Sequence, residues 1–199
     1  MKVGIAGGIG SGKSFVAKLL AERGIPVYDC DAAAKRLMHA SPLLRQQLTA
    51  LIGPDCYILS SPSTLHPSPP VPRLNKAAVT RFLLASEDNA SALQAIVHPA
   101  VFTDFEQSGM LWMESAIMFE SGANRHVDRV VVVTAPDEIR LQRVMSRDNI
   151  SRQQALQWMA RQWPQQRVRQ LAHYEIVNDG CADLGPQIDR LLAALGTIK

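Results

Sequence analysis

The residues most suited to chemistry lie at positions 7–14, which read GGIGSGKS. This octapeptide matches the pattern G-x-x-x-x-G-K-[S/T] without a mismatch. Glycines allow a tight turn in which backbone N–H groups point at phosphate oxygens, and a helix that begins at Ser14 adds its N-terminal donors. We therefore predict a phosphate-binding loop (P-loop) in which the Lys13 ammonium lies against the β- and γ-phosphates of a nucleotide and the Ser14 hydroxyl binds Mg²⁺. The alternative is a glycine-rich turn without a ligand.

A pair of carboxylates, Asp29 and Asp31, follows the second expected strand. Parallel sheets build their sites at the carboxyl ends of strands, and alternation along an extended chain would point both carboxylates to the same side. A kinase needs such a group to orient or deprotonate the acceptor hydroxyl. Asp31 could instead cap a helix that begins at Ala32, and the two roles can coexist.

Arginines further along the chain could stabilise the charge of a transferred phosphoryl group. Arg143 and Arg147 are four residues apart on an expected helix and so share one face, and Arg161 follows on the next helix. Together they suggest a mobile lid that closes over phosphates, although arginines on helix surfaces are often only solvated. No guanine-reading [N/T]-K-x-D motif occurs, and residues 111–114 (LWME) resemble an acidic Walker B strand only loosely. These features favour a small-molecule kinase over a GTPase or a motor ATPase.

The elements that must position these residues alternate along the chain. Apolar patterns predict a strand, a helix and a strand at 2–6, 14–23 and 25–28, which implies a right-handed βαβ unit and a parallel sheet. Further strands are expected at 111–113, 127–134 and 174–177, and helices at 32–52, 75–105, 151–163 and 188–195. A helix break is expected at His98-Pro99, and Pro136 fits the first turn of the helix that carries Arg143. The predicted fold class is α/β, a parallel P-loop NTPase-type sheet flanked by helices, with a helical substrate-binding subdomain and a lid.

Residues 54–72 differ in character from the rest of the chain. They hold six of the twelve prolines, mixed with serines, so they should form neither a helix nor a central strand. We expect an exposed loop, which is more typical of a tolerated surface insertion than of a dedicated binding element.

Composition sets the broad class of protein. With 199 residues, 47% of them hydrophobic and 20% charged, the chain can build one well-cored domain with a small inserted subdomain. The net charge of +3 without a long Lys/Arg run suits polyanionic small substrates better than nucleic acid. The three cysteines are widely separated and match no metal motif, which indicates a reducing compartment. Neither a signal peptide nor a membrane span is expected, so the expected location is cytoplasmic.

Taken in order, several segments resemble the dephospho-CoA kinase family, the last enzyme of coenzyme A synthesis. The resemblance runs from residue 1 to about residue 180. Apart from the P-loop each element is weakly specific, and the order and spacing of the elements carry the resemblance. The elements are GGIGSGKS with Gly24 and the Asp29/Asp31 pair, LNK at 74–76, IVHP at 96–99, IMFE at 117–120, Arg143 with Arg147-Asp148, Gln162, and IVNDG at 176–180.

The resemblance implies transfer of the ATP γ-phosphate to the ribose 3′-hydroxyl of dephospho-CoA, with ATP and Mg²⁺ as cofactors. It implies a small-molecule partner, without nucleic acid or membrane, and a monomer or small homo-oligomer. Asp31 would be the base or orienting carboxylate, and Lys13, Arg143 and Arg147 would stabilise phosphoryl charge. The implied ATP-binding residues, with Ser14 also ligating the metal and the last two near the adenine, are Gly8, Ile9, Gly10, Ser11, Gly12, Lys13, Ser14, Phe15, Asn178 and Gly180. The implied substrate-binding residues are Asp29, Asp31, Lys35, His98 and Glu120.

By the same resemblance, a core at about 1–31, 107–140 and 164–199 would carry a helical CoA-binding subdomain at about 32–106 and a lid at about 141–163. The chain departs from the family pattern at several positions. Phe15 replaces a usual Thr and is expected to affect packing behind the loop. Lys35 replaces an Arg, which keeps the charge and loses the bidentate fork, and Ala116 replaces a Pro. His98 can also be interpreted as a packed or capping histidine. Two rival functions stay open, a kinase of the nucleoside or shikimate type and a non-catalytic nucleotide-binding regulator.

Overall fold

The computed structural model describes residues 1–59 and 72–196. The chain divides into two compact units, and each is described by itself. The sheet unit comprises Met1–Cys30 and Ser108–Lys199, and the helical unit comprises Asp31–Gln107.

A parallel sheet forms the centre of the sheet unit. Within the described residues its five strands stand in the order β2-β5-β1-β6-β7, and every neighbouring pair is parallel. Their bounds are β1 Val3–Ala6, β2 Val27–Asp29, β5 Trp112–Glu114, β6 Arg129–Thr134 and β7 Tyr174–Val177. The apolar run of β6 is buried at all but its first residue, as expected of a strand covered on both faces. The predicted fold class is confirmed, and all five strands end at the same edge.

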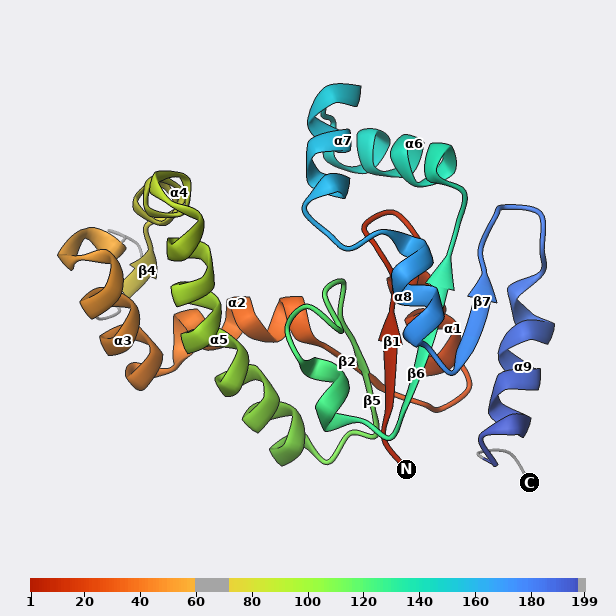
Figure 1. The fold of residues 1–199 in the computed structure, drawn as a ribbon. Helices are drawn as coiled ribbons and strands as arrows, with labels where there is room; N and C mark the ends of the chain where they lie inside the picture. The colour runs from red at the N-terminus through yellow and green to blue at the C-terminus, as the bar shows by residue number, and fades with distance from the viewer. Residues whose placement is uncertain (60–71, 197–199) are drawn as a thin grey trace, which may run out of the picture. The chain divides into compact units, whose positions relative to one another are not determined.

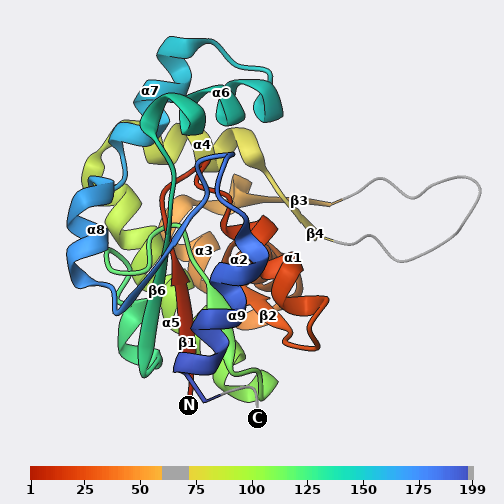
Figure 2. The ribbon, with the colours of Figure 1, turned by 90° about the vertical axis from the view of Figure 1, so that its right-hand side faces the viewer.

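Helices cover both faces of this sheet (Figures 1 and 2). Helices α1 (Lys13–Ala21) and α9 (Leu184–Ala194) lie together on one face, and α8 (Gln165–Leu171) lies on the other. Helices α6 (Asp137–Asp148) and α7 (Arg152–Ala160) form a hairpin beyond the end of β6, and the short turn η2 spans Ala123–His126. The sequence patterns did not predict α8.

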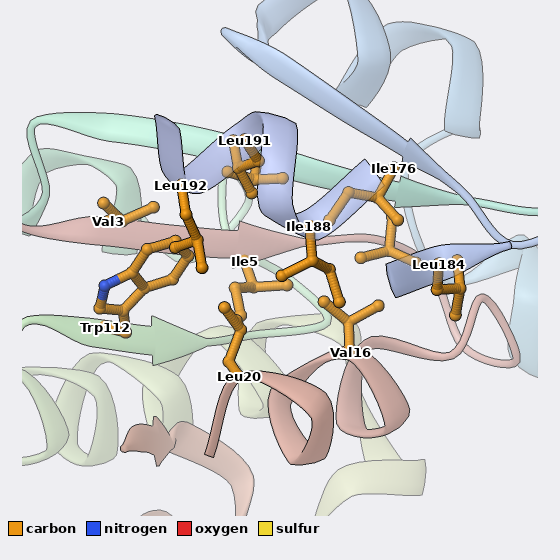
Figure 3. Close-up of a cluster of buried hydrophobic side chains, with 12 residues drawn as sticks. Val3, Ile5, Val16, Leu20, Trp112, Ile176, Leu184, Ile188, Leu191 and Leu192 are labelled. Carbon is orange, nitrogen blue, oxygen red and sulfur yellow. The ribbon is translucent and has the colours of Figure 1, made fainter. Parts of the chain in front are cut away.

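The core under α1 and α9 holds the P-loop helix against the sheet. Figure 3 shows Val16 and Leu20 of α1 and Ile188 of α9 meeting Ile5 of β1, and all four side chains are fully buried. Because fully burying a side chain of this size contributes about 1.5–3 kcal/mol, this cluster fixes the start of α1 beside the end of β1.

The helical unit combines helices with a short hairpin. Its helices are α2 (Cys30–Ala40, whose first residue belongs to the sheet unit), α3 (Pro42–Ile52), α4 (Lys76–Ala85) and α5 (Glu87–Ser108, which ends one residue beyond the unit). A 3₁₀ turn at Pro54–Cys56 leads into the antiparallel pair β3 (Tyr57–Leu59) and β4 (Pro72–Leu74). The side chains of Ser41 and Asn75 cap α3 and α4 by accepting backbone N–H bonds.

Two expectations about this unit were wrong. The helix does not break at His98-Pro99, since α5 continues through Pro99. Val97 and Val101 flank this proline and are buried, so packing compensates for the hydrogen bond that proline removes. The break lies at Ser86, which is extended and whose hydroxyl accepts the N–H of Asp88 at 3.1 Å.

The predicted loop at 54–72 is wrong at both of its ends. Residues 54–59 form the 3₁₀ turn and β3, and Pro72 starts β4. Pro72 fits a two-stranded hairpin because each strand there has an edge that needs no N–H donor. Residues 60–71 lie outside the described residues. None of the helices in the described ranges combines the length and the hydropathy needed to span a lipid bilayer.

Candidate active site

The loop of residues 7–14 joins the end of β1 to the start of α1, as the motif predicts. Gly12 is the N-cap residue of α1 and supplies no side-chain cap, so the first turn of the helix presents its positive end to an anion. Inside the loop the Ser11 N–H donates to the carbonyl of Gly8 at 3.1 Å, and the Lys13 ammonium donates to the same carbonyl at 3.5 Å. This geometry suits phosphate binding.

Two glycines of the loop allow other parts of the sheet unit to approach closely. A Cβ at Gly8 would overlap the Arg140 guanidinium, and a Cβ at Gly12 (φ +94°) would overlap the side-chain amide of Asn178. The Ser11 hydroxyl is buried and has no hydrogen-bond partner among the described residues. A cradle of backbone amides with an unsatisfied hydroxyl fits a phosphate-bearing nucleotide.

A buried carboxylate lies beside the P-loop serine. The Ser14 hydroxyl donates to Glu114 at 3.2 Å, and Glu114 is the last residue of β5 and is 7% exposed. Asp29, the last residue of β2, stands in register with Glu114. Hydroxyl and carboxylate oxygens at this spacing are the donors that Mg²⁺ takes in kinase sites. From the sequence, Glu114 was noted only within a loose Walker B resemblance and was not named as a site residue; the acid at the end of the expected strand at 111–113 was the available signal.

Asn178 and Arg143 meet at the P-loop. The Asn178 amide donates to the Ser11 carbonyl at 2.9 Å, and its oxygen accepts from Arg143 at 3.3 Å. Arg143 also donates to the carbonyls of Gly10 and Ser11, both at 3.4 Å. The structure thus brings together two predicted site residues that are 35 positions apart in the chain.

The turn after Asn178 is stabilised by the side chain of Asp179, which lies within the turn. The Asp179 carboxylate accepts the N–H groups of Ala182 at 2.8 Å and Cys181 at 2.9 Å, which holds the pKa of Asp179 below its usual value. Gly180 occupies a left-handed conformation in this turn, with φ +85°. An adenine contact by Asn178 or Gly180 stays a prediction.

The second predicted lid arginine does not join this cluster. Arg147 is 62% exposed on its side chain and pairs with Asp148 at 2.7 Å. That hydrogen bond raises the pKa of Arg147 and lowers the pKa of Asp148. Arg161 is likewise exposed, at the end of α7.

Glu120 contacts the segment that follows α7, and Arg140 is buried within α6. Glu120, a predicted substrate ligand, accepts the backbone N–H of Trp163 at 2.9 Å. Arg140 was not predicted as a site residue, although it is 5% exposed and donates to Asp137 at 2.9 Å. Burial lowers the pKa of Arg140, and the nearby Asp137 carboxylate opposes that shift.

The argument that Asp29 and Asp31 point to the same side was wrong. Strand β2 ends at Asp29 and α2 begins at Cys30, so alternation does not continue to Asp31. Asp31 lies inside the first helical turn, not at an N-cap before Ala32, and a carboxylate there is favoured by the helix dipole.

Three predicted substrate residues belong to the helical unit. Asp31 and Lys35 are exposed and lie four residues apart on α2, where helical geometry places them on one face. Burial lowers the pKa of His98 on α5, and the Asp31 carboxylate opposes that shift. The His98 ring also lies 6.0 Å from the ring of Phe102.

Phe15 does not pack behind the loop, contrary to expectation. Its side chain is 52% exposed, whereas its neighbour Val16 is fully buried in the core. Helix α1 therefore turns Val16 toward the sheet and Phe15 away from it.

Comparisons with known proteins identify the family of the chain. A model of the dephospho-CoA kinase family matches residues 1–183. The chain is 37% identical over 202 residues to a dephospho-CoA kinase of Bacteroides fragilis, covering 98% of this chain and 93% of that one. It is 34% identical over 206 residues to one of Chlorobaculum tepidum, covering 98% and 95%.

Solved structures show the same fold. A Thermus thermophilus crystal structure aligns with a TM-score of 0.77 at 29% identity over 100% of this chain and 98% of its own. The dephospho-CoA kinase of Campylobacter jejuni aligns with a TM-score of 0.62 at 18% identity over 100% of both chains. An Acinetobacter baumannii shikimate kinase aligns with a TM-score of 0.57 at 17% identity over 98% and 93%. The sequence relatives and the family match are decisive, and the chain belongs to the dephospho-CoA kinase family.

Proposed function

We propose that the protein transfers the γ-phosphoryl group of ATP to the ribose 3′-hydroxyl of dephospho-CoA, which yields coenzyme A and ADP in the final step of coenzyme A synthesis. The observation that carries the proposal is the P-loop, which is joined to Arg143 by Asn178 and to Glu114 by Ser14, in a chain that matches the family over residues 1–183.

The residues of the sheet unit act on the nucleotide. The phosphates are bound by loop amides other than those of Ile9 and Ser11, which are already hydrogen bonded within the protein, and by amides at the start of α1. The Lys13 ammonium moves from the Gly8 carbonyl to the β- and γ-phosphate oxygens. Arg143, held 3.4 Å from two loop carbonyls, neutralises the charge that develops on the transferred group. Arg147 leaves Asp148 and joins Arg143 when the α6–α7 hairpin closes.

Mg²⁺ fits the pair of oxygens supplied by Ser14 and Glu114 and, when bound, would neutralise charge on the β- and γ-phosphates. Glu114 would hold the Ser14 hydroxyl toward the ion, because the two are already hydrogen bonded at 3.2 Å. Glu114 is 7% exposed, so packing restricts the rotamers open to its side chain.

The helical unit binds the acceptor substrate and carries the general base, Asp31. Asp31 accepts the proton of the 3′-hydroxyl while the 3′-oxygen forms its bond to the γ-phosphorus and the bond from that phosphorus to the β–γ bridging oxygen breaks. The resemblance to the family assigns four further residues to substrate binding, which are Asp29, Lys35, His98 and Glu120. Residues about 32–106 would then be the CoA-binding subdomain.

A substrate panel tests the reaction. With Mg-ATP, we expect the purified protein to phosphorylate dephospho-CoA and to leave shikimate and nucleosides unchanged. The Asp31→Asn variant should bind ATP normally while phosphoryl transfer falls by about two to four orders of magnitude. Asp55→Asn, which changes another exposed carboxylate of the helical unit, is the matched control and should keep full activity. An unchanged rate in Asp31→Asn would refute the role of Asp31.

We also propose a cytoplasmic location. All three cysteines are free thiols, two buried and one exposed, as a reducing compartment allows. Fractionation of the native cells, with the protein detected by antibody, tests this location.

A further inference from the structure

Ile9, in the P-loop, is attached to the α6–α7 hairpin by both of its main-chain polar groups. Its N–H donates to the side-chain oxygen of Gln162 at 2.7 Å. Its carbonyl accepts from Nε of Arg140 at 3.1 Å. Arg140 lies in the first turns of α6 and Gln162 lies just after α7, so the two ends of the hairpin hold the same residue.

The side chain of Ile9 is a third attachment. It packs against the small core of the hairpin, whose buried members are Leu141, Val144 and Ala155. An apolar P-loop side chain is thus part of the packing between α6 and α7, and main chain and side chain tie the loop to the same element.

The neighbours of Ile9 are shaped for this contact. Gly8 leaves room for the Arg140 guanidinium, and a Cβ there would also lie 3.3 Å from Oε1 of Gln162. A Cβ at Gly10 would lie 2.5 Å from the backbone carbonyl of Arg140. The glycines on both sides of Ile9 therefore allow the close approach of the hairpin as well as the turn of the loop.

Gln162 is also anchored on its far side. Its amide nitrogen donates to the Ala116 carbonyl at 3.3 Å, and the next residue, Trp163, donates its N–H to Glu120 at 2.9 Å. Gln162 therefore joins the P-loop, the segment after β5 and the return of the hairpin through one amide group.

We propose that Gln162 is a positioning residue that couples the P-loop to the α6–α7 hairpin through Ile9, so that phosphate binding at the loop and ordering of the hairpin favour each other. The inference rests on the nucleotide-binding role proposed above for the P-loop. Gln162 acts through the Ile9 peptide, not through contact with the nucleotide. Because coupling is reciprocal, a variant that loosens the hairpin from the loop weakens nucleotide binding and reduces the effect of nucleotide on the hairpin by the same factor.

The test combines Gln162→Met with Ile9→Ala. Gln162→Met keeps most of the side-chain volume and removes both hydrogen bonds, and Ile9→Ala keeps the hydrogen bonds and removes the packing. We expect about five- to tenfold weaker binding of Mg-ADP by calorimetry in each variant, from the loss of one or two interactions of ordinary strength. Hydrogen exchange of the α6–α7 amides should slow on addition of Mg-ADP in the wild type and slow by a correspondingly smaller factor in both variants.

Gln157→Ala is the matched control, because Gln157 is exposed on α7 and belongs to the same hairpin. It should bind Mg-ADP and protect the hairpin as the wild type does. Coupling is refuted if Gln162→Met keeps wild-type affinity and protection, or if its affinity falls while Mg-ADP still protects the hairpin fully. It is also refuted if Gln157→Ala shows the same losses as Gln162→Met. A loss of melting temperature without a loss of affinity indicates a merely structural role and also refutes it. A wild type that binds no Mg-ADP would refute the proposed function and this inference together, whereas a wild type with normal binding and turnover isolates a failure of the coupling alone.

Discussion

The substitution Gly12→Ala tests the close packing of the Asn178 side chain against the P-loop. Gly12 has φ +94°, and a Cβ there would overlap the side-chain amide of Asn178. An L-residue in a left-handed conformation costs about 1–2 kcal/mol. The displaced amide also gives up its bonds to the Ser11 carbonyl and to Arg143, at about 1 kcal/mol each.

The combined cost is therefore roughly 3–4 kcal/mol, which corresponds to roughly 10²–10³ in an equilibrium constant. If the loop keeps its shape, this cost appears as a lower free energy of unfolding. If the loop shifts to relieve the overlap, it appears as weaker Mg-ADP binding. Urea denaturation and calorimetry on the same protein measure the two parts, and their sum should reach the estimated total.

Gly24→Ala provides the matched control. Gly24 also has a left-handed backbone, with φ +78°, but among the described residues no atom beyond Gly24 and its two chain neighbours lies within 4 Å of its Cβ position. This variant should lose about 1–2 kcal/mol of stability and bind Mg-ADP normally. The reasoning fails if Gly12→Ala resembles the wild type in both assays, or if Gly24→Ala loses as much affinity as Gly12→Ala.

Three further predictions concern the metal, pH and the core. Glu114→Gln should lower the rate of phosphoryl transfer by about 10²-fold, because the carboxylate charge is lost. Binding of metal-free ADP should be retained. A rate equal to that of the wild type at limiting Mg²⁺ would contradict this prediction. Burial lowers the pKa of His98, so its stabilising contribution is present above about pH 6.5 and is lost as the pH falls. The free energy of unfolding of the wild type should therefore exceed that of His98→Gln by less at pH 5 than at pH 8. A larger excess at pH 5 would contradict this prediction. Leu20→Ala should cost about 2–5 kcal/mol in urea denaturation because Leu20 is fully buried, and a cost below about 1 kcal/mol would show that the site collapses.

Local features of the site could be predicted from the sequence. The P-loop is contiguous, and its strand–turn–helix context follows from neighbouring apolar residues, so residues 7–14 were placed correctly. The parallel sheet followed from the alternation of strands and helices. The break predicted at Pro99 failed because burial of Val97 and Val101 outweighs the local preference of proline.

Contacts between distant residues could not be predicted. Ser14 and Glu114 are 100 positions apart, and Ile9 and Gln162 are 153 apart. Only the strand order, with β1 between β5 and β6, brings β5 beside the P-loop strand and returns the chain from α6 to the loop. Asp31 was misplaced for a local reason, because helix α2 starts directly at the end of β2 and no extended residues intervene.

Identification of the phosphorylated product is the most direct test of the central claim. Purified protein is incubated with dephospho-CoA and Mg-ATP, and the product is analysed by mass spectrometry and phosphorus NMR. Formation of coenzyme A bearing the new phosphate on the ribose 3′-oxygen, in amounts equal to the ADP released, is the predicted result. ADP released without coenzyme A, or phosphate attached at another oxygen, would contradict the proposed reaction.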